Sequence, residues 1–163
     1  MTIYAIGDLH FSGLPPAKPM EKFGEHWTGH RDKVTANWQR LVQPQDLVLV
    51  CGDISWGMTL AEAKPDLESI AALPGHKILL KGNHDYWWTS LAKMQTAYPG
   101  QFAFLQNNFY SWGDTAICGT RGWILPGVEG FKDDDVPRLR REALRLEMSL
   151  AAAQKAGFTK LIC

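Results

Sequence analysis

The sequence lacks a surplus of charge of either sign, and it has few cysteines. Among its 163 residues, 17 are Lys or Arg and 17 are Asp or Glu, so the formal net charge is zero. A neutral chain gives no electrostatic reason to expect nucleic acid or an anionic membrane as the main partner. The three cysteines, Cys51, Cys118 and Cys163, lie far apart in apolar sequence. They are predicted to be buried free thiols in a reducing compartment, not a disulfide framework or a zinc ribbon.

Long hydrophobic segments are also missing. No run of 18 or more apolar residues is present, so we expect no membrane span. The first ten residues, MTIYAIGDLH, have neither the basic region nor the long apolar region of a secretory signal. These absences predict a cytoplasmic protein. The chain has no repeats and no low-complexity linker, and its length suits a single domain over residues 1–163.

Short apolar runs alternate with amphipathic stretches in the first hundred residues. The runs are TIYAI (2–6), LVLVC (47–51) and KILLK (77–81), and they are typical of strands buried on both faces. Helical patterns cover 26–42, 60–73 and 88–98. Alternation of strands and helices predicts an α/β fold built from βαβ units with right-handed crossovers.

The pattern changes after residue 100. The segments FYSW and TAICG flank Gly113 and Asp114, which predicts a hairpin. A long helix is expected over 136–156, because apolar residues recur there at helical spacing. The final residues, KLIC, predict the start of another strand.

Each of the three predicted parallel strands is followed by glycine and then by polar residues. These polar residues are Asp8 and His10 after the first strand, Asp53 after the second, and Asn83, His84 and Asp85 after the third. Ligands of such sheets bind beyond the carboxyl ends of the strands, so neighbouring strands would bring these groups to one point. Carboxylates, an imidazole and an amide suit Mn, Fe, Zn or similar divalent ions. Each motif alone is more often a turn or a helix cap, but the three in this order rarely arise by chance.

The segments GDLH, GDIS and GNHD resemble the successive D-x-H, G-D and G-N-H-[DE] blocks of the calcineurin-like metallophosphoesterase superfamily. The resemblance covers most of the chain and extends to the bacterial-type contexts KPMEKFGEHW, GNHDYWW and CGTRGW. It implies the N-terminal part of a four-layer αββα sandwich with mixed β-sheets. It also implies two divalent metal ions of the Mn, Fe, Zn or Ni class. By position, Asp8 and His10 would bind the first ion, Asp53 would bridge, and Asn83 would bind the second.

The resemblance also implies roles for the two residues that follow Asn83. His84 would lie beside the phosphate and stabilise charge or protonate the leaving oxygen, and Asp85 would orient His84. The expected reaction is metal-dependent hydrolysis of a phosphoester, a monoester or a diester, in a small phosphorylated substrate. A non-catalytic member that binds or regulates another protein is the main alternative. A nuclease is a third, against which the zero net charge argues.

The family carries further ligands that do not occur in this sequence, namely a later histidine and a G-H-x-H block. Because the chain stops at Cys163, we expect a C-terminally incomplete domain with a weak second metal site. An uncovered apolar sheet would also favour self-association.

Three further residues are candidates for substrate binding. His26 and His30 are spaced i, i+4, which on a helix can bind a metal or help to hold substrate, although a solvated first turn is the commoner meaning of this spacing. The planar fork of Arg121 could contact a phosphate or form a surface ion pair. Trp87 and Trp88 are expected in the core.

Overall fold

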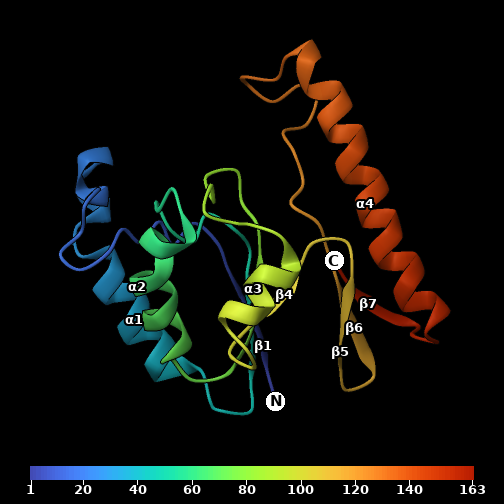
Figure 1. Cartoon of the computed structure of the whole chain (residues 1–163), viewed down its shortest axis with the longest axis horizontal. Coiled ribbons are helices and arrows are strands. Elements are labelled where there is room, and N and C mark those ends of the chain that lie inside the picture. The colour runs from blue at the N-terminus through green and yellow to red at the C-terminus, as the bar shows by residue number, and fades with distance from the viewer. The chain divides into compact units, whose positions relative to one another are not determined.

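The computed structural model describes residues 1–163, which fold as two compact units, Met1–Phe104 and Leu105–Cys163. The first unit contains a sheet with the strand order β1-β2-β3-β4, in which β2 pairs in parallel with both β1 and β3 (Figure 1). Its elements are β1 (Ile3–Ile6), η1 (Met20–Phe23), η2 (Glu25–Trp27), α1 (His30–Leu41), β2 (Leu47–Val50), α2 (Leu60–Ala71), β3 (His76–Leu80), α3 (Leu91–Ala97) and β4 (Ala103–Leu105). The carboxyl ends of β1, β2 and β3 therefore meet at one edge, where the three motif segments begin.

One apolar cluster joins the strands of this unit to its helices. All four residues of β2 are buried, as expected of a strand covered on both faces. Trp38 on α1 and Leu67 on α2 belong to the same buried cluster as Leu79 on β3. Trp87 and Trp88 also belong to this cluster and are 1% and 7% exposed, so their prediction as core residues is confirmed.

The helix predicted from residue 26 begins later, at His30. Gly29 has a φ of 63°, in the left-handed region that interrupts a right-handed helix, and Glu25–Trp27 form a separate 3-10 turn. His26 and His30 therefore lie on different elements. The prediction that they form an i, i+4 pair on one helix is wrong.

The second unit combines a hairpin, a long helix and a short parallel strand. Its elements are β5 (Phe109–Trp112), β6 (Thr115–Cys118), η3 (Asp133–Asp135), α4 (Val136–Lys155) and β7 (Lys160–Ile162). β6 pairs with β5 antiparallel and with β7 parallel, so this sheet is mixed. The predicted hairpin, helix and final strand are confirmed, and so is the mixed α/β class of the chain. No helix of the structure has both the length and the hydropathy needed to cross a membrane.

The cysteines match their prediction only in part. All three are free thiols, but Cys118 alone is buried, whereas Cys51 and Cys163 are exposed. The predicted burial is wrong for these two because each lies one residue beyond the end of its strand, β2 or β7.

Candidate metal centre

Main-chain hydrogen bonds join the loop after β1 to the loop after β2. The amide of Asp8 donates to the carbonyl oxygen of Gly52 at 3.1 Å, and the amide of His10 donates to that of Asp53 at 2.8 Å. One residue further, Phe11 forms a parallel bridge with Ser55. The parallel pairing of β1 with β2 thus continues beyond the strands, and it fixes the polar side chains of the two loops relative to each other.

The carboxylate of Asp85 joins the third loop to the second. It is fully buried and accepts hydrogen bonds from the main-chain N–H groups of Asp53, Ile54, Ser55 and Gly82 and from the indole of Trp87. We expected Asp85 to orient the His84 ring, and this assignment is corrected: its two oxygens lie under the loop that carries Asp53. Burial raises the pKa of Asp85, and the N–H bonds oppose that rise.

Two glycines let the second and third loops approach closely. A Cβ atom on Gly82 would lie 2.0 Å from Oδ1 of Asp53, and one on Gly52 would lie 2.7 Å from the Cα of Gly82. Either methyl group would collide with main chain or with a candidate ligand. Glycine is therefore required at both positions for Asp53 to reach the centre.

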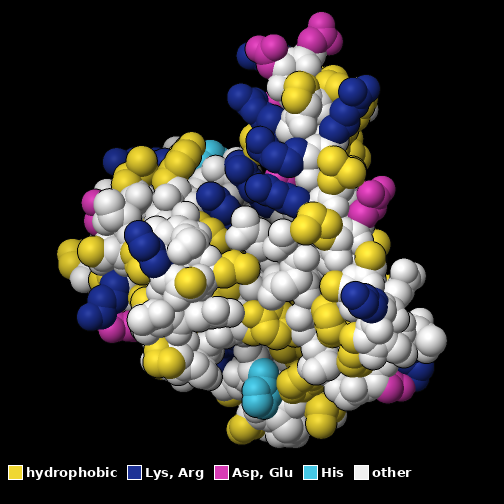
Figure 2. All heavy atoms as spheres, turned by 45° about the vertical axis from the view of Figure 1, so that its right-hand side comes forward, with side chains coloured by type: hydrophobic (Ala, Val, Ile, Leu, Met, Phe, Trp, Pro, Cys, Tyr) yellow, Lys and Arg dark blue, Asp and Glu magenta, His cyan; other side chains and the backbone are white.

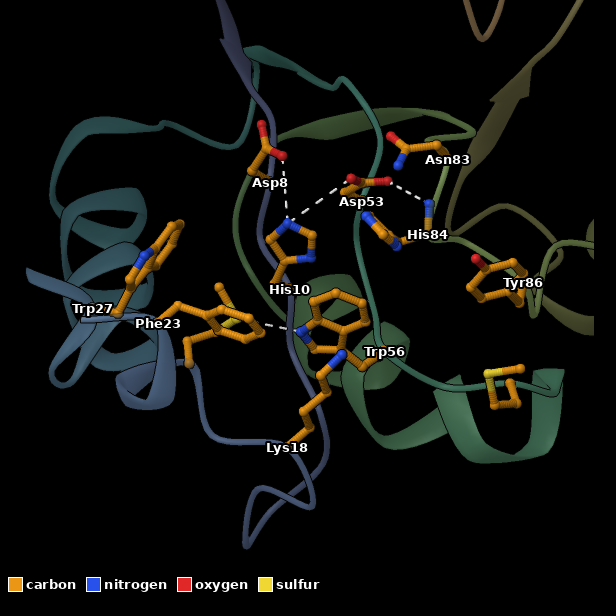
Figure 3. A pocket seen from close by; sticks show the side chains of 12 residues that line it. Asp8, His10, Lys18, Phe23, Trp27, Asp53, Trp56, Asn83, His84 and Tyr86 are labelled. Carbon is orange, nitrogen blue, oxygen red and sulfur yellow. Dashed lines mark hydrogen bonds and ion pairs between the residues drawn. The ribbon is translucent and has the colours of Figure 1, made fainter. Parts of the chain in front are cut away.

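Asp8, His10 and Asp53 converge at the edge of the sheet (Figure 3). One possible ligand atom from each lies within 4.8 Å of the others. Nε2 of His10 is 3.4 Å from Oδ1 of Asp8 and 3.9 Å from Oδ2 of Asp53. These three residues are also the only ones other than glycine with positive φ, at 57°, 47° and 52°. Strained backbone of this kind costs on the order of 1–3 kcal/mol per residue and clusters at functional sites.

Stacking fixes the ring of His10. Its plane lies at 17° to that of Trp56, with ring centroids 4.6 Å apart, and its buried Nδ1 has no hydrogen-bond partner. The indole N–H of Trp56 in turn contacts the sulfur of Met20 at 3.3 Å, and the ammonium of Lys18 lies 3.2 Å from the centroid of the Trp56 ring. Burial lowers the pKa of His10, although Asp53 and Asp8 act in the opposite direction. Its imidazole therefore favours the neutral form, which can bind a metal.

Asn83 and His84 lie beside this cluster. Both line the same cavity as Asp8, His10 and Asp53, and Asn83 is exposed. The main-chain N–H of His84 donates to Oδ1 of Asp53 at 2.9 Å. The GNHD segment thus orients the Asp53 carboxylate by its backbone, while the imidazole of His84 remains available on the cavity side (Figure 3).

The cavity has a volume of about 920 Å³, and sequence reasoning missed one of its sides. The side chains that it missed are mainly apolar or aromatic: Lys18, Met20, Phe23, Trp56, Met58 and Tyr86. They come from η1 and from loops without periodic patterning, so no local signal marked them. The resembling contexts were the only indication: KPMEKFGEHW contains Lys18, Met20 and Phe23, and GNHDYWW contains Tyr86. Trp27 on η2, expected to cap the site together with His26 and His30, also lines the cavity.

The remaining candidates lie elsewhere. The ring of His30 is bonded through Nε2 to the carbonyl oxygen of Leu9 at 3.0 Å, and neither His30 nor the exposed His26 lines the cavity. Their predicted place at the site is therefore corrected, and Trp27 between them occupies it. Arg121 belongs to the second unit, where its guanidinium lies 4.6 Å from the centroid of the Trp123 ring.

A family model described as calcineurin-like phosphoesterase matches residues 1–151. The chain belongs to the calcineurin-like phosphoesterase family. This membership supports a general activity, the metal-dependent hydrolysis of phosphoesters. The predicted membership of this family is thereby confirmed.

Comparison of this chain with solved structures gives the fold alone. A crystal structure from Aquifex aeolicus, described as the protein of unknown function AQ665, is similar with a TM-score of 0.51 and 19% identity, over 99% of this chain and 77% of that one. No curated protein matches the sequence.

The centre fits a divalent cation by its donor set. Two carboxylates and the lone pair of a neutral imidazole face one another, and no Lys or Arg side chain lies among them. Such an arrangement is repulsive unless a cation or a proton is shared. Oxygen and nitrogen donors of this kind suit Mn, Fe, Zn or Ni ions.

Proposed function

We propose that this chain hydrolyses a phosphoester bond of a small substrate, a monoester or a diester, with two divalent metal ions. Asp8 and His10 would hold the first ion, Asp53 would contact both, and Asn83 would contribute its amide oxygen to the second. The observation that carries the proposal is the convergence of Asp8, His10 and Asp53 in strained backbone at the floor of a large cavity.

The two ions would polarise the phosphoryl oxygens and make a nucleophile available near neutral pH. The residues of the chain position the reaction. The Asp85 bonds and the main-chain N–H of His84 hold the Asp53 carboxylate, and Trp56 holds the His10 ring. The imidazole of His84 faces the cavity, where it can donate a hydrogen bond or a proton to the leaving oxygen.

The test is turnover of p-nitrophenyl phosphate and of bis(p-nitrophenyl) phosphate with added Mn²⁺. Asp53→Asn should lower kcat/KM by about 100-fold or more, because loss even of indirect support for a metal typically costs 10–100-fold. Asp32→Asn, which removes an exposed acid on α1, should leave the rate unchanged. Stoichiometric Mn²⁺ binding without turnover of either ester would contradict the proposal and favour a non-catalytic binding role.

His84 is tested separately from the metal ligands. His84→Ala should lower kcat by about 10²–10⁴-fold, the usual contribution of a general acid. Its bound Mn²⁺, measured by titration, should stay as in the unchanged protein, because its backbone N–H to Asp53 is retained. A parallel loss of metal would make His84 a ligand and would overturn this role.

A further inference from the structure

An apolar rim surrounds the candidate metal centre. Phe23 from η1, Met58 from the loop before α2 and Tyr86 from the loop after β3 all line the cavity that contains Asp8, His10 and Asp53. They are 54%, 59% and 58% exposed, so each presents apolar surface to a ligand in the cavity. Trp27 adds a half-buried indole on the same side of the cavity as Phe23 (Figure 3).

The faces of Trp56 are occupied by the protein itself. His10 stacks on it, and the Lys18 ammonium lies over its ring. The rings of Phe23 and Tyr86, in contrast, approach the centre from opposite sides (Figure 3). They are the aromatic surfaces with most area open to a ligand.

The cavity is large enough for more than a phosphate. Its volume of about 920 Å³ falls in the range of small-molecule sites, about 300–1,000 Å³. Away from the metal centre its lining offers aromatic rings and thioethers, with Lys18 as the only Lys or Arg side chain. Aromatic pairs and sulfur–ring contacts favour a flat ring, whereas the many hydroxyls of a sugar would find few partners there.

We propose that the substrate of this site is a phosphoester whose organic group carries an aromatic ring, of which a nucleobase is one biological form. The phosphate would lie at the centre formed by Asp8, His10 and Asp53, and the ring would pack against the apolar rim, beside Phe23 or Tyr86. This inference rests on the proposed function, because it assigns a substrate class to the same centre.

The probes are phenylphosphonate and propylphosphonate, whose P–C bonds are not hydrolysed. The two compounds carry the same charged group, and only one of them has an aromatic ring. Binding is measured in place of turnover, so differences in leaving-group reactivity do not affect the comparison. Calorimetric titration of the Mn²⁺-loaded full chain should give about tenfold tighter binding of the phenyl compound, the scale expected from burying a ring against aromatic side chains.

At least one of Phe23→Ala and Tyr86→Ala should reduce that affinity ratio, and the double variant should bring it close to one. The ratio is measured between two ligands on one protein, so a general loss of metal would weaken both ligands alike and leave it unchanged. Leu144→Ala, at a 60% exposed position on α4, is the matched control and should keep the ratio.

The experiment distinguishes a wrong substrate class from a wrong proposed function. If both phosphonates bind with equal affinity, or if the double variant keeps the full ratio, the substrate class is wrong while the phosphoesterase proposal stands. If neither phosphonate binds at millimolar concentration and neither chromogenic ester is turned over, the proposed function itself fails.

Discussion

The two units of the chain differ in the contacts that stabilise each of them internally. In Met1–Phe104, large apolar side chains from the strands and helices are fully buried, among them Ile70, Leu79 and Phe104. In Leu105–Cys163, Leu105 and Ile117 are also fully buried, but the apolar cluster beneath the long helix is small: it consists of Ala116, Cys118 and Ala153, with half-buried rings and leucines against it.

Buried polar side chains of the long helix accompany the smaller apolar cluster of the second unit. On α4, Glu142 and Ser149 are buried, while Leu144 and Met148 are 60% and 56% exposed. Figure 2 shows Lys, Arg and hydrophobic side chains exposed together along this helix. The hydroxyl of Ser149 accepts a hydrogen bond from the amide of Gly119 at 3.1 Å and donates one to the main-chain oxygen of Asn108, in the loop before β5.

This difference accounts for where backbone strain is found. Asp8, His10 and Asp53, the residues other than glycine with positive φ, all belong to the first unit. Strain persists only where the surrounding structure over-determines it, and the large core and the bonds of Asp85 supply that support. The unit with the deeper core can therefore hold a preorganised centre.

The largest effect is expected from Asp85→Ala, which removes the support of the centre and leaves buried N–H groups without acceptors. The free energy of unfolding of the first unit should fall by about 3–5 kcal/mol, the cost of leaving a buried polar network unpaired. Urea denaturation followed by tryptophan fluorescence measures the loss. Asp32→Ala should show only a small change, and an equal change in both variants would show that the Asp85 bonds are not what holds these loops.

A smaller effect is expected from Trp56, which positions His10 by stacking. Trp56→Leu should weaken Mn²⁺ binding by about 10–100-fold, as loss of the groups that orient a metal ligand generally does. Trp56→Phe retains a flat ring and should recover most of the affinity. Isothermal titration with Mn²⁺ gives the comparison, and an identical affinity in the Leu and Phe variants would assign the orientation of His10 to other contacts.

In the second unit, Ser149→Ala should lower the free energy of unfolding by about 1–2 kcal/mol, because the buried N–H of Gly119 and the half-buried carbonyl of Asn108 each lose a partner. Amide hydrogen exchange of β5, β6 and α4 should quicken accordingly, while Mn²⁺ affinity should not change. Ser111→Ala removes an exposed hydroxyl from β5 and serves as the control. Faster exchange in β1–β3 as well would contradict the assignment of this bond to the second unit alone.

Much of this fold could be predicted because its signals are local. The runs before Gly7, Gly52 and Gly82 form β1, β2 and β3 to within a residue or two, since their short length, aliphatic composition and flanking glycine all favour a strand over a helix. The start of α1 could not be placed, because the left-handed conformation of Gly29 depends on its surroundings. The three-residue strand β4 is too short to have a pattern.

Only those residues of the candidate centre that directly follow a strand could be predicted from the sequence. Asp8, His10 and Asp53 converge because they follow neighbouring parallel strands, which is a general property of such sheets. The position of Asp85 under the Asp53 loop and the apolar rim depend on contacts between segments distant in sequence, for which no local pattern exists. Their roles in metal and substrate binding stay predictions.

The smallest expected effect is on the pH dependence of stability. Each unit has a carboxyl group whose pKa is lowered in the folded protein. In the first unit, main-chain N–H bonds from Gln43 and Thr2 lower the pKa of Asp46. In the second, the Trp123 indole and the amide of Lys132 lower the pKa of Asp135. Because both folded pKa values lie below the ordinary 3.8, each group contributes stability that is present above that pH and is lost as the pH falls through the folded pKa.

Asn cannot titrate, so each Asp→Asn variant should remove this pH dependence from its own unit only. Between pH 5 and pH 3, Asp46→Asn should flatten the loss of protection of β1 and β2 amides in hydrogen exchange, and Asp135→Asn should flatten that of α4 amides. Each variant is the control for the other, because the same acid range acts on both. If either substitution flattened the pH dependence of both units alike, the two would share one acid transition, and the contrast between a unit held by its core and a unit held by polar bonds would not extend to their response to pH.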